Sequence, residues 1–199
     1  MLMEMVIKGH FKEEERLNET NIAKELGVSQ TPVRESLVAL ECQGFVTFYP
    51  NRGFVVKPFT REEGHDLYYA IAELEVIALQ GAVWPNDEIL EKAQELNDQF
   101  KQAEDPEERV DVDVEWHDLL ISQTSNQYLR ELISLTKQRV FRYEWNFMSG
   151  SIEKSIQNHD DIIAELKKGN VKQATKILKK NNLIGLPQLD EWLSSRNKK

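Results

Sequence analysis

Residues 19–43 constrain this chain more than any other segment, because they read as two short amphipathic helices separated by a glycine turn. Gly27 ends the first helix, Ser29 is a good N-cap for the second, and Pro32 is tolerated in a first turn. The layout is that of a helix-turn-helix, whose second helix enters the major groove of DNA. The apolar positions expected to face the core are Ile22, Ala23, Leu26, Val33, Leu37 and Leu40.

The polar face of the second helix and the segment behind it both offer contacts to DNA. Gln30, Thr31 and Arg34 lie on the outer, N-terminal side of that helix. Two short β-type segments follow, and the turn Pro-Asn-Arg-Gly between them places Arg52 at a hairpin tip, within reach of a minor groove or a phosphate. A helix-turn-helix used only for protein contacts is the alternative. The agreement between helix pair, Arg34 and basic hairpin tip argues against it.

The charge distribution confines any DNA contact to the N-terminal part. The chain has a net charge of −9, yet residues 1–60 contain 7 lysines and arginines against 8 aspartates and glutamates. The excess acidity beyond residue 60 would repel DNA. The N-terminal part must therefore bind through a few well-placed basic groups.

Cysteine usage and hydropathy favour the cytoplasm. Cys42 is the single cysteine and has no partner for an internal disulfide. The N-terminus lacks the apolar core of a secretory signal, and no apolar run approaches the ~20 residues of a membrane helix. We therefore expect a cytoplasmic protein with no membrane partner.

The remainder of the chain predicts a helical bundle without strands. The expected fold class is mainly α, with an N-terminal winged helix-turn-helix, including a small β-hairpin wing, at 1–58 and a C-terminal all-α bundle at 59–199. A capping box of Thr60 and Glu63 starts the bundle. Helices are expected from 60 to before Pro85, at 86–105, 110–122, 127–148, 152–168 and 171–182, with a short helix after Pro187.

Two of these expected helices hold a candidate metal site. Asp113 and His117 are four residues apart and share one helical face, and His159 lies in another helix beside apolar residues. An aspartate and two histidines can bind a divalent transition metal. A satisfied polar pair without a metal is the alternative and stays open.

The run LGVSQTPVRESLVALECQGFVTFYPNRGFVV resembles the winged helix of the GntR family of transcriptional regulators. The resemblance implies that Thr31 and Arg34 contact operator DNA, and that the wing tip at Arg52 and Gly53 contacts the minor groove. Family members usually have an arginine at the position of Gln30, and often another at that of Thr20, so these contacts have less charge here. Only nine residues precede His10, so part of the usual first helix is expected to be missing.

The helices after this module, with Asp113-x-x-x-His117 followed by Ser-x-x-Ser-Asn, resemble the FCD ligand-binding domain of the FadR-type subfamily. The resemblance implies a divalent Zn²⁺, Ni²⁺ or Mn²⁺ ion held by Asp113, His117 and His159. Asn181 stands where the family has its last metal histidine, which predicts a weakened site with three good ligands.

The family's effector is typically a small organic acid, bound by the metal and by an arginine in the first helix of the domain. Ile71 occupies that arginine's position. Arg139 and Arg142 are candidate substitutes for binding the effector, and the alternative is that both are solvated surface charges.

These features together predict a ligand-responsive regulator, a repressor that binds a palindromic operator in double-stranded DNA as a homodimer. One alternative is a regulator that has lost effector sensing and acts constitutively, which Ile71 and Asn181 favour. Another is a metal-dependent hydrolase built on Asp113, His117 and His159. The sequence shows no general base of defined spacing, no nucleophile elbow and no phosphate loop, so we expect no enzyme.

Overall fold

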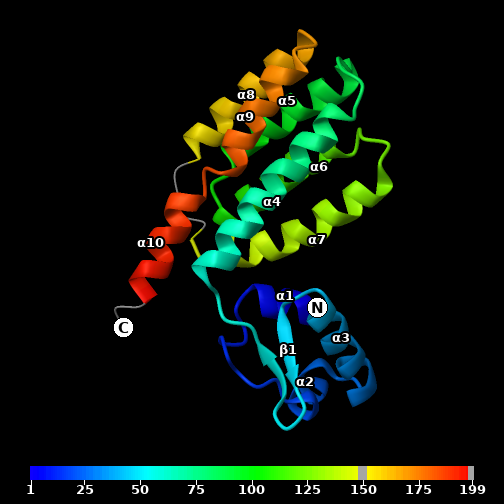
Figure 1. The fold of residues 1–199 in the computed structure, drawn as a ribbon, viewed down its shortest axis with the longest axis vertical. Helices are drawn as coiled ribbons and strands as arrows, with labels where there is room; N and C mark the ends of the chain where they lie inside the picture. Colours follow the sequence, from blue (N-terminus) through cyan, green and yellow to red (C-terminus); the bar gives the residue numbers. More distant parts are fainter. Residues whose placement is uncertain (148–151, 197–199) are drawn as a thin grey trace.

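The protein consists of a small N-terminal module and a longer helical body, stacked along the long axis of the molecule in the computed structural model (Figure 1). The structure describes residues 1–147 and 152–196. The described part contains ten helices and one two-stranded antiparallel sheet. This is the mainly α architecture expected from the sequence.

The N-terminal module is a three-helix unit followed by a hairpin. Its elements are α1 (Leu2–Ile7), α2 (Glu19–Leu26), α3 (Gln30–Cys42), β1 (Val46–Tyr49) and β2 (Gly53–Val56). Gly27 ends α2 in the left-handed conformation, with φ of 67°, as its residue type predicts. The buried side chains of α3 are Val33, Leu37 and Leu40, each no more than 2% exposed.

The first helix of the module is short but present. Leu2, Val6 and Ile7 of α1 are buried in the same hydrophobic cluster as the α3 residues. Six residues are enough to cover the core, because three of them point inward.

The wing is a regular hairpin. Val46 pairs with Val56 and Tyr49 with Gly53 in antiparallel register. Gly53 has φ of +79°, a backbone conformation that other residues rarely adopt. The turn at 50–52 therefore returns directly into β2.

The helical body has seven helices in the described part of the chain. They are α4 (Arg61–Gln80), α5 (Asp87–Gln102), α6 (Pro106–Ile121), α7 (Gln127–Glu144), α8 (Glu153–Lys167), α9 (Val171–Asn182) and α10 (Leu186–Arg196). Helix α4 packs against α7 on one side and α9 on the other, while α5 packs against α6 and α8. Figure 1 shows α6 and α7 on the right of the body and α8 and α9 on the left.

Several helix boundaries differ from the sequence-based expectation. Helix α4 ends at Gln80 rather than just before Pro85, and α5 ends at Gln102 rather than at 105. Helix α6 begins at Pro106 rather than at 110, because the Asp105 side chain accepts the Glu108 N–H and proline suits a first turn. Helix α10 begins at Leu186, so Pro187 lies inside its first turn rather than before it. Helix α7 ends at Glu144, and the expected end at 148 lies outside the described residues.

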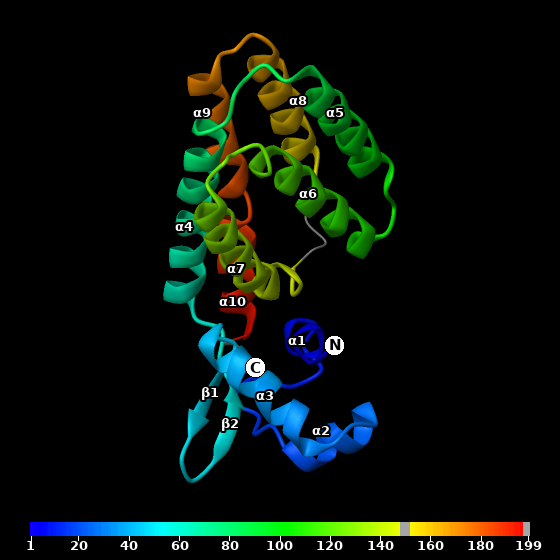
Figure 2. The same cartoon turned by 90° about the vertical axis from the view of Figure 1, so that its right-hand side faces the viewer.

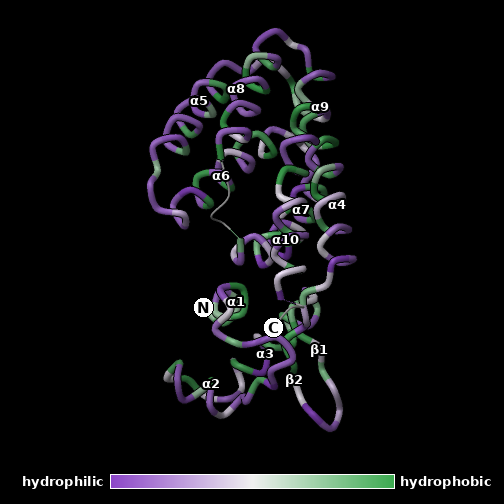
Figure 3. Tube along the Cα trace, turned by 90° about the vertical axis from the view of Figure 1, so that its left-hand side faces the viewer, coloured by the Kyte–Doolittle hydropathy of each residue, from purple (hydrophilic) through white to green (hydrophobic). Residues whose placement is uncertain are grey.

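The apolar side chains of the body form two hydrophobic clusters. One is built around α4, α7 and α10, and the other around α5, α6, α8 and α9. Figure 3 shows the hydrophobic segments turned inward along these helices and the hydrophilic ones outward. Within residues 1–147 and 152–196, no helix is long and apolar enough to cross a membrane.

Candidate DNA interface and ligand cavity

The N-terminal end of α3 presents a polar surface to solvent. Thr20, Gln30, Thr31 and Arg34 are all exposed. The Gln30 amide donates to the Thr20 hydroxyl over 3.2 Å, so the two positions that lack a family arginine lie side by side. The Arg34 side chain is 60% exposed and pairs with Glu19 at 3.4 Å. A guanidinium in this position is free to exchange that partner for a base edge or a phosphate.

The wing brings a second basic group to the same module. The Arg52 side chain is exposed, and its Nη2 donates to the Glu14 carbonyl over 3.3 Å. Figure 2 shows the hairpin and α2 at the end of the molecule that points away from the helical body. Recognition helix and wing are therefore free of cover from the acidic body.

The predicted metal residues meet inside the helical body. Asp113 and His117 on α6 and His159 on α8 each offer one ligand atom, and these atoms lie within 4.8 Å of one another. The Nε2 atoms of His117 and His159 face Asp113 oxygens at 4.0 and 3.6 Å. His117 is 5% exposed and His159 is fully buried.

Both histidines are held by their other ring nitrogen. His117 Nδ1 lies 2.8 Å from Glu75 Oε2, and a carboxylate only accepts, so Nδ1 donates. His159 Nδ1 lies 3.1 Å from the side-chain oxygen Oδ1 of Asn97, and the side-chain nitrogen Nδ2 of Asn97 donates to Asp160. When each imidazole is neutral, its Nε2 lone pair therefore faces the centre of the cluster, as in a metal site with oriented imidazoles.

Asn181 closes the cluster on the fourth side. Its Nδ2 lies 3.3 Å from His117 Nε2 and 3.2 Å from His159 Nε2, and its Oδ1 accepts from Asn158. The amide thus directs N–H groups at both imidazole lone pairs. Three donor atoms fit a divalent ion, and a buried Asp113 oxygen has no hydrogen-bond partner in the described part of the chain. The Asn181 side-chain amide would have to rotate before a metal ion could bind, because its Nδ2 now faces both imidazoles.

Burial and neighbouring charges shift the pKa values of Glu75 and His159 in this cluster. Burial raises the pKa of Glu75, but the charges of His117 and Lys137 outweigh it, and the pKa lies well below its ordinary range. Burial, followed by the charge of His117, holds the pKa of His159 far below its ordinary value. His159 is therefore neutral, the form in which imidazole binds a metal.

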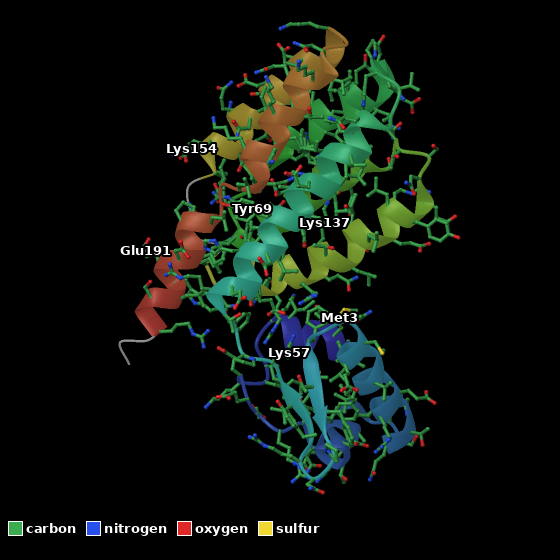
Figure 4. All side chains as sticks on the ribbon, in the orientation of Figure 1. Met3, Lys57, Tyr69, Lys137, Lys154 and Glu191 are labelled. Carbon is green, nitrogen blue, oxygen red and sulfur yellow. The ribbon has the colours of Figure 1, made fainter. Side chains whose placement is uncertain are left out.

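A cavity of about 190 Å³ opens beside this cluster, between α4, α6, α7 and α10. Asp113, His117 and Asn181 are among the residues that line it. Lys137, labelled in Figure 4 on α7, pairs with Glu75 at 3.2 Å and with Asp118 at 2.6 Å. The cavity thus lies directly against the candidate metal residues.

Arg139 and Arg142 lie elsewhere. Neither lines this cavity, although both are among the described residues. The Arg139 guanidinium pairs with Glu63 at 2.5 Å and lies beside Gly44 of the N-terminal module. Arg142 is 3% exposed and donates to the carbonyl of Lys57 in the linker. Both arginines contact the N-terminal module or its linker, with Arg142 buried and the Arg139 side chain 33% exposed.

The sequence interpretation missed several residues of the site. Glu75 is one of these, because its role in holding His117 depends on the packing of α4 against α6. Asn97 and Asn158 gave no signal, since buried asparagines have no motif. The sequence also gave no signal for three further residues that line the cavity, Tyr68, Glu144 and Gln188.

An exposed recognition helix and a basic wing, joined to a helical body with an internal cavity, define a DNA-binding transcriptional regulator. Comparison with known proteins identifies the family. Residues 1–56 match the bacterial regulatory proteins of the gntR family, and residues 66–181 match the FCD domain. The chain therefore belongs to the GntR family and has the FadR-type architecture with a C-terminal FCD domain.

Relatives agree with this assignment. The HTH-type transcriptional regulator YdhC of Bacillus subtilis is 29% identical over 88% of this chain and 81% of its own length. The Nta operon transcriptional regulator of Aminobacter aminovorans is 31% identical over 71% of this chain and 69% of its own length. The structure of E. coli McbR/YncC shares the fold, with a TM-score of 0.77, 22% identity and coverage of 96% of this chain and 93% of that one.

Proposed function

We propose that this regulator is a ligand-responsive repressor that binds a palindromic operator as a homodimer. The observation that carries the proposal is a single helix, α7, with two functional faces. Lys137 and Glu144 line the cavity from one face. Arg139 and Arg142 contact Gly44 and the linker from the other.

That geometry gives an effector a route to the DNA-binding module. A ligand that moves α7 also moves the side chains that hold the linker, because both sets belong to one rigid helix. Tyr143 strengthens the junction, since its hydroxyl donates to Glu63 at 2.8 Å and accepts from the Thr60 N–H at 3.2 Å. Effector binding would therefore change the angle between paired winged helices and their match to half-site spacing.

On the DNA side, Arg34 and Thr31 would reach base edges, with Gln30 and Thr20 hydrogen-bonding nearby. Arg52 and the backbone at Gly53 would contact the minor groove beside the half-site. Few of these groups are charged, so affinity depends on each of them more than in a strongly basic module.

Asp113, His117 and His159 would hold a divalent Zn²⁺, Ni²⁺ or Mn²⁺ ion, with Asn181 or water completing the coordination. Such an ion supplies a fixed positive charge that binds an oxygen or nitrogen of the effector. Glu75 and Asn97 keep both imidazoles in the orientation that coordination needs.

A second copy of the chain would cover an apolar face of the helical body. Ile77 on α4 and Leu132 and Leu135 on α7 are 52%, 54% and 46% exposed, and these two helices pack side by side. A two-fold dimer through this face buries them and leaves both winged helices available for the two half-sites. Leu132→Asp should yield monomers in sedimentation velocity, while Lys176→Ala on exposed α9 surface should leave the dimer intact.

The test of DNA binding is a titration of the full chain against DNA from immediately upstream of its own gene, at two salt concentrations. Wild type should bind with a steep salt dependence, and Arg34→Ala should lose about 10- to 100-fold in affinity. Lys176→Ala removes one positive charge from the helical body and should bind like wild type. Equal affinity of wild type and Arg34→Ala would overturn the assignment of the recognition helix.

A further inference from the structure

The cavity is lined by polar residues that do not belong to the candidate metal cluster. Glu144, at the C-terminal end of α7, accepts a hydrogen bond from the Tyr68 hydroxyl over 3.0 Å. Gln188 of α10 lines the same cavity, and its Oε1 is buried with no hydrogen-bond partner among the described residues. Gln188 Oε1 and the remaining lone pairs of the Glu144 carboxylate can therefore accept hydrogen bonds from a ligand.

Two basic side chains that line the cavity, Lys137 and Arg109, have partners other than Glu144. Lys137 pairs with Glu75 at 3.2 Å and with Asp118 at 2.6 Å. Arg109 Nε donates to the Ala103 carbonyl over 2.7 Å. Within the described residues, neither Lys137 nor Arg109 forms an ion pair with Glu144, whose hydrogen bond comes from a neutral phenol. A carboxylate at this depth without a cation is costly.

The electrostatics and the packing both mark the part of the cavity around Glu144 as a built site. Burial raises the pKa of Glu144 to about 7, with the charge of Asp113 adding to the shift and the Tyr68 hydrogen bond and the charges of His117 and Lys137 only partly opposing it. Gly185 leaves the room that Tyr68 needs, because a Cβ at Gly185 would lie 2.5 Å from the Tyr68 hydroxyl oxygen. The glycine thus allows Tyr68 to reach Glu144.

The remaining walls define the size and polarity of a ligand. Phe100, Phe141 and Phe147 line the cavity and offer an aromatic surface. Its volume of about 190 Å³ slightly exceeds the roughly 150 Å³ of an engineered cavity that binds benzene. A ligand of benzene size with one short polar arm would fill it.

We infer that the effector carries a protonated amine, which binds Glu144 and Gln188 while its apolar part lies against the three phenylalanines. This inference rests on the proposed ligand-responsive function. An ammonium group donates three hydrogen bonds and would pair with the Glu144 carboxylate, whereas a carboxylate at this position would meet the acceptor oxygens of Glu144 and Gln188. The effector class implied by the family resemblance, a small organic acid, also needs an arginine where this chain has Ile71.

The test compares ligands of matched shape and opposite charge. Isothermal titration and thermal shift of the full-length protein, as purified, are run with benzylamine against benzoate and with butylamine against butyrate, and with benzyl alcohol as the neutral form. The amines should bind and raise the melting temperature, while the carboxylates and the alcohol bind at least about tenfold more weakly.

Glu144→Gln isolates the charge, because glutamine keeps the shape and still accepts from Tyr68. It should weaken amine binding about tenfold or more, and Glu115→Gln on the exposed face of α6 should not change it. Tighter binding of the carboxylates, no amine binding at millimolar concentration, or an unchanged amine affinity in Glu144→Gln would overturn the inference. These readouts contain no DNA. Carboxylate binding would therefore refute the amine and still leave a ligand-responsive repressor, whereas a failed operator titration would refute the repressor alone.

Discussion

The winged helix-turn-helix and the helical body use their polar residues in opposite ways. In the N-terminal module, Arg34 and Gln30 stand exposed on a small hydrophobic core. In the helical body, Glu75 and His159 are no more than 1% exposed and are held in a continuous hydrogen-bonded network. The first region keeps its functional groups available to an external polymer. The second encloses them around a cavity for a small ligand.

This difference predicts how substitutions propagate. Substitution of a surface residue such as Arg34 should affect DNA binding, under the proposed function, and stability little, because Arg34 has few partners to lose. A buried residue such as Glu75 contributes to both, because its loss leaves Lys137 and His117 without their counter-charge. Each region should therefore retain its own function when a substitution destabilises the other region.

The largest expected effect comes from a matched pair of core truncations. Leu37→Ala in α3 should cost about 2–5 kcal/mol and Trp116→Ala in α6 about 3–5 kcal/mol, since both side chains are fully buried. Leu37→Ala should abolish operator binding while Zn²⁺ uptake by the helical body persists. Trp116→Ala, which removes the ring stacked at 3.7 Å on His159, should do the reverse. Thermal melts followed by both binding assays check this, and simultaneous loss of both functions in each variant would break the comparison.

The next effect concerns the fourth side of the metal cluster. Asn181→His replaces an amide that donates to both imidazoles with a fourth ligand of the family type. Zn²⁺ affinity, measured by competition with a chromophoric chelator, should rise at least about tenfold. His159→Ala is the control and should lose the ion. An unchanged affinity in Asn181→His would show that Asn181 does not limit binding.

A smaller effect is expected from Glu144 through pH. Its pKa is raised to about 7 in the folded protein, above the ordinary value of 4.5. The folded state therefore binds a proton more tightly than the unfolded state, and its stability falls as pH rises between these values. At pH 8, Glu144→Gln should be more stable than wild type by about 1–3 kcal/mol, and at pH 4 equally stable. Urea unfolding at both pH values measures this, and a difference that does not change with pH would contradict it.

The smallest effect is expected at the wing. Arg52 is exposed, and its side chain makes one hydrogen bond, to a backbone carbonyl, in the described part of the chain. Arg52→Ala should weaken operator binding a few-fold and reduce the salt slope by about 1. Binding titrations over a salt series provide both numbers. A loss as large as that of Arg34→Ala would mean that the wing reads sequence rather than backbone.

The two regions also differed in how far the sequence predicted them. The turn at Gly27, the core positions of α3 and the hairpin follow from local rules of capping and periodicity, and the structure confirms them. The convergence of Asp113 with His117 and His159 was predicted from spacing and resemblance together, and the structure brings these residues into one cluster.

The rest of the cavity was beyond local rules. Arg139 and Arg142 carry the right charge for an organic acid, but the rotation of α7 turns them toward the linker and places Glu144 in the cavity. Such a rotation depends on how α7 packs against α4, and a lone helical pattern does not define it.

The central claim is sequence-specific operator binding through α3, and a selection of bound genomic fragments tests it most directly. Wild-type protein and Arg34→Ala are each incubated with fragmented DNA of the source genome, and the retained fragments are sequenced. The account predicts that wild type enriches fragments with a shared inverted repeat, and that Arg34→Ala enriches none. Enrichment of the same repeat by both proteins, or of no repeat by wild type, would contradict it.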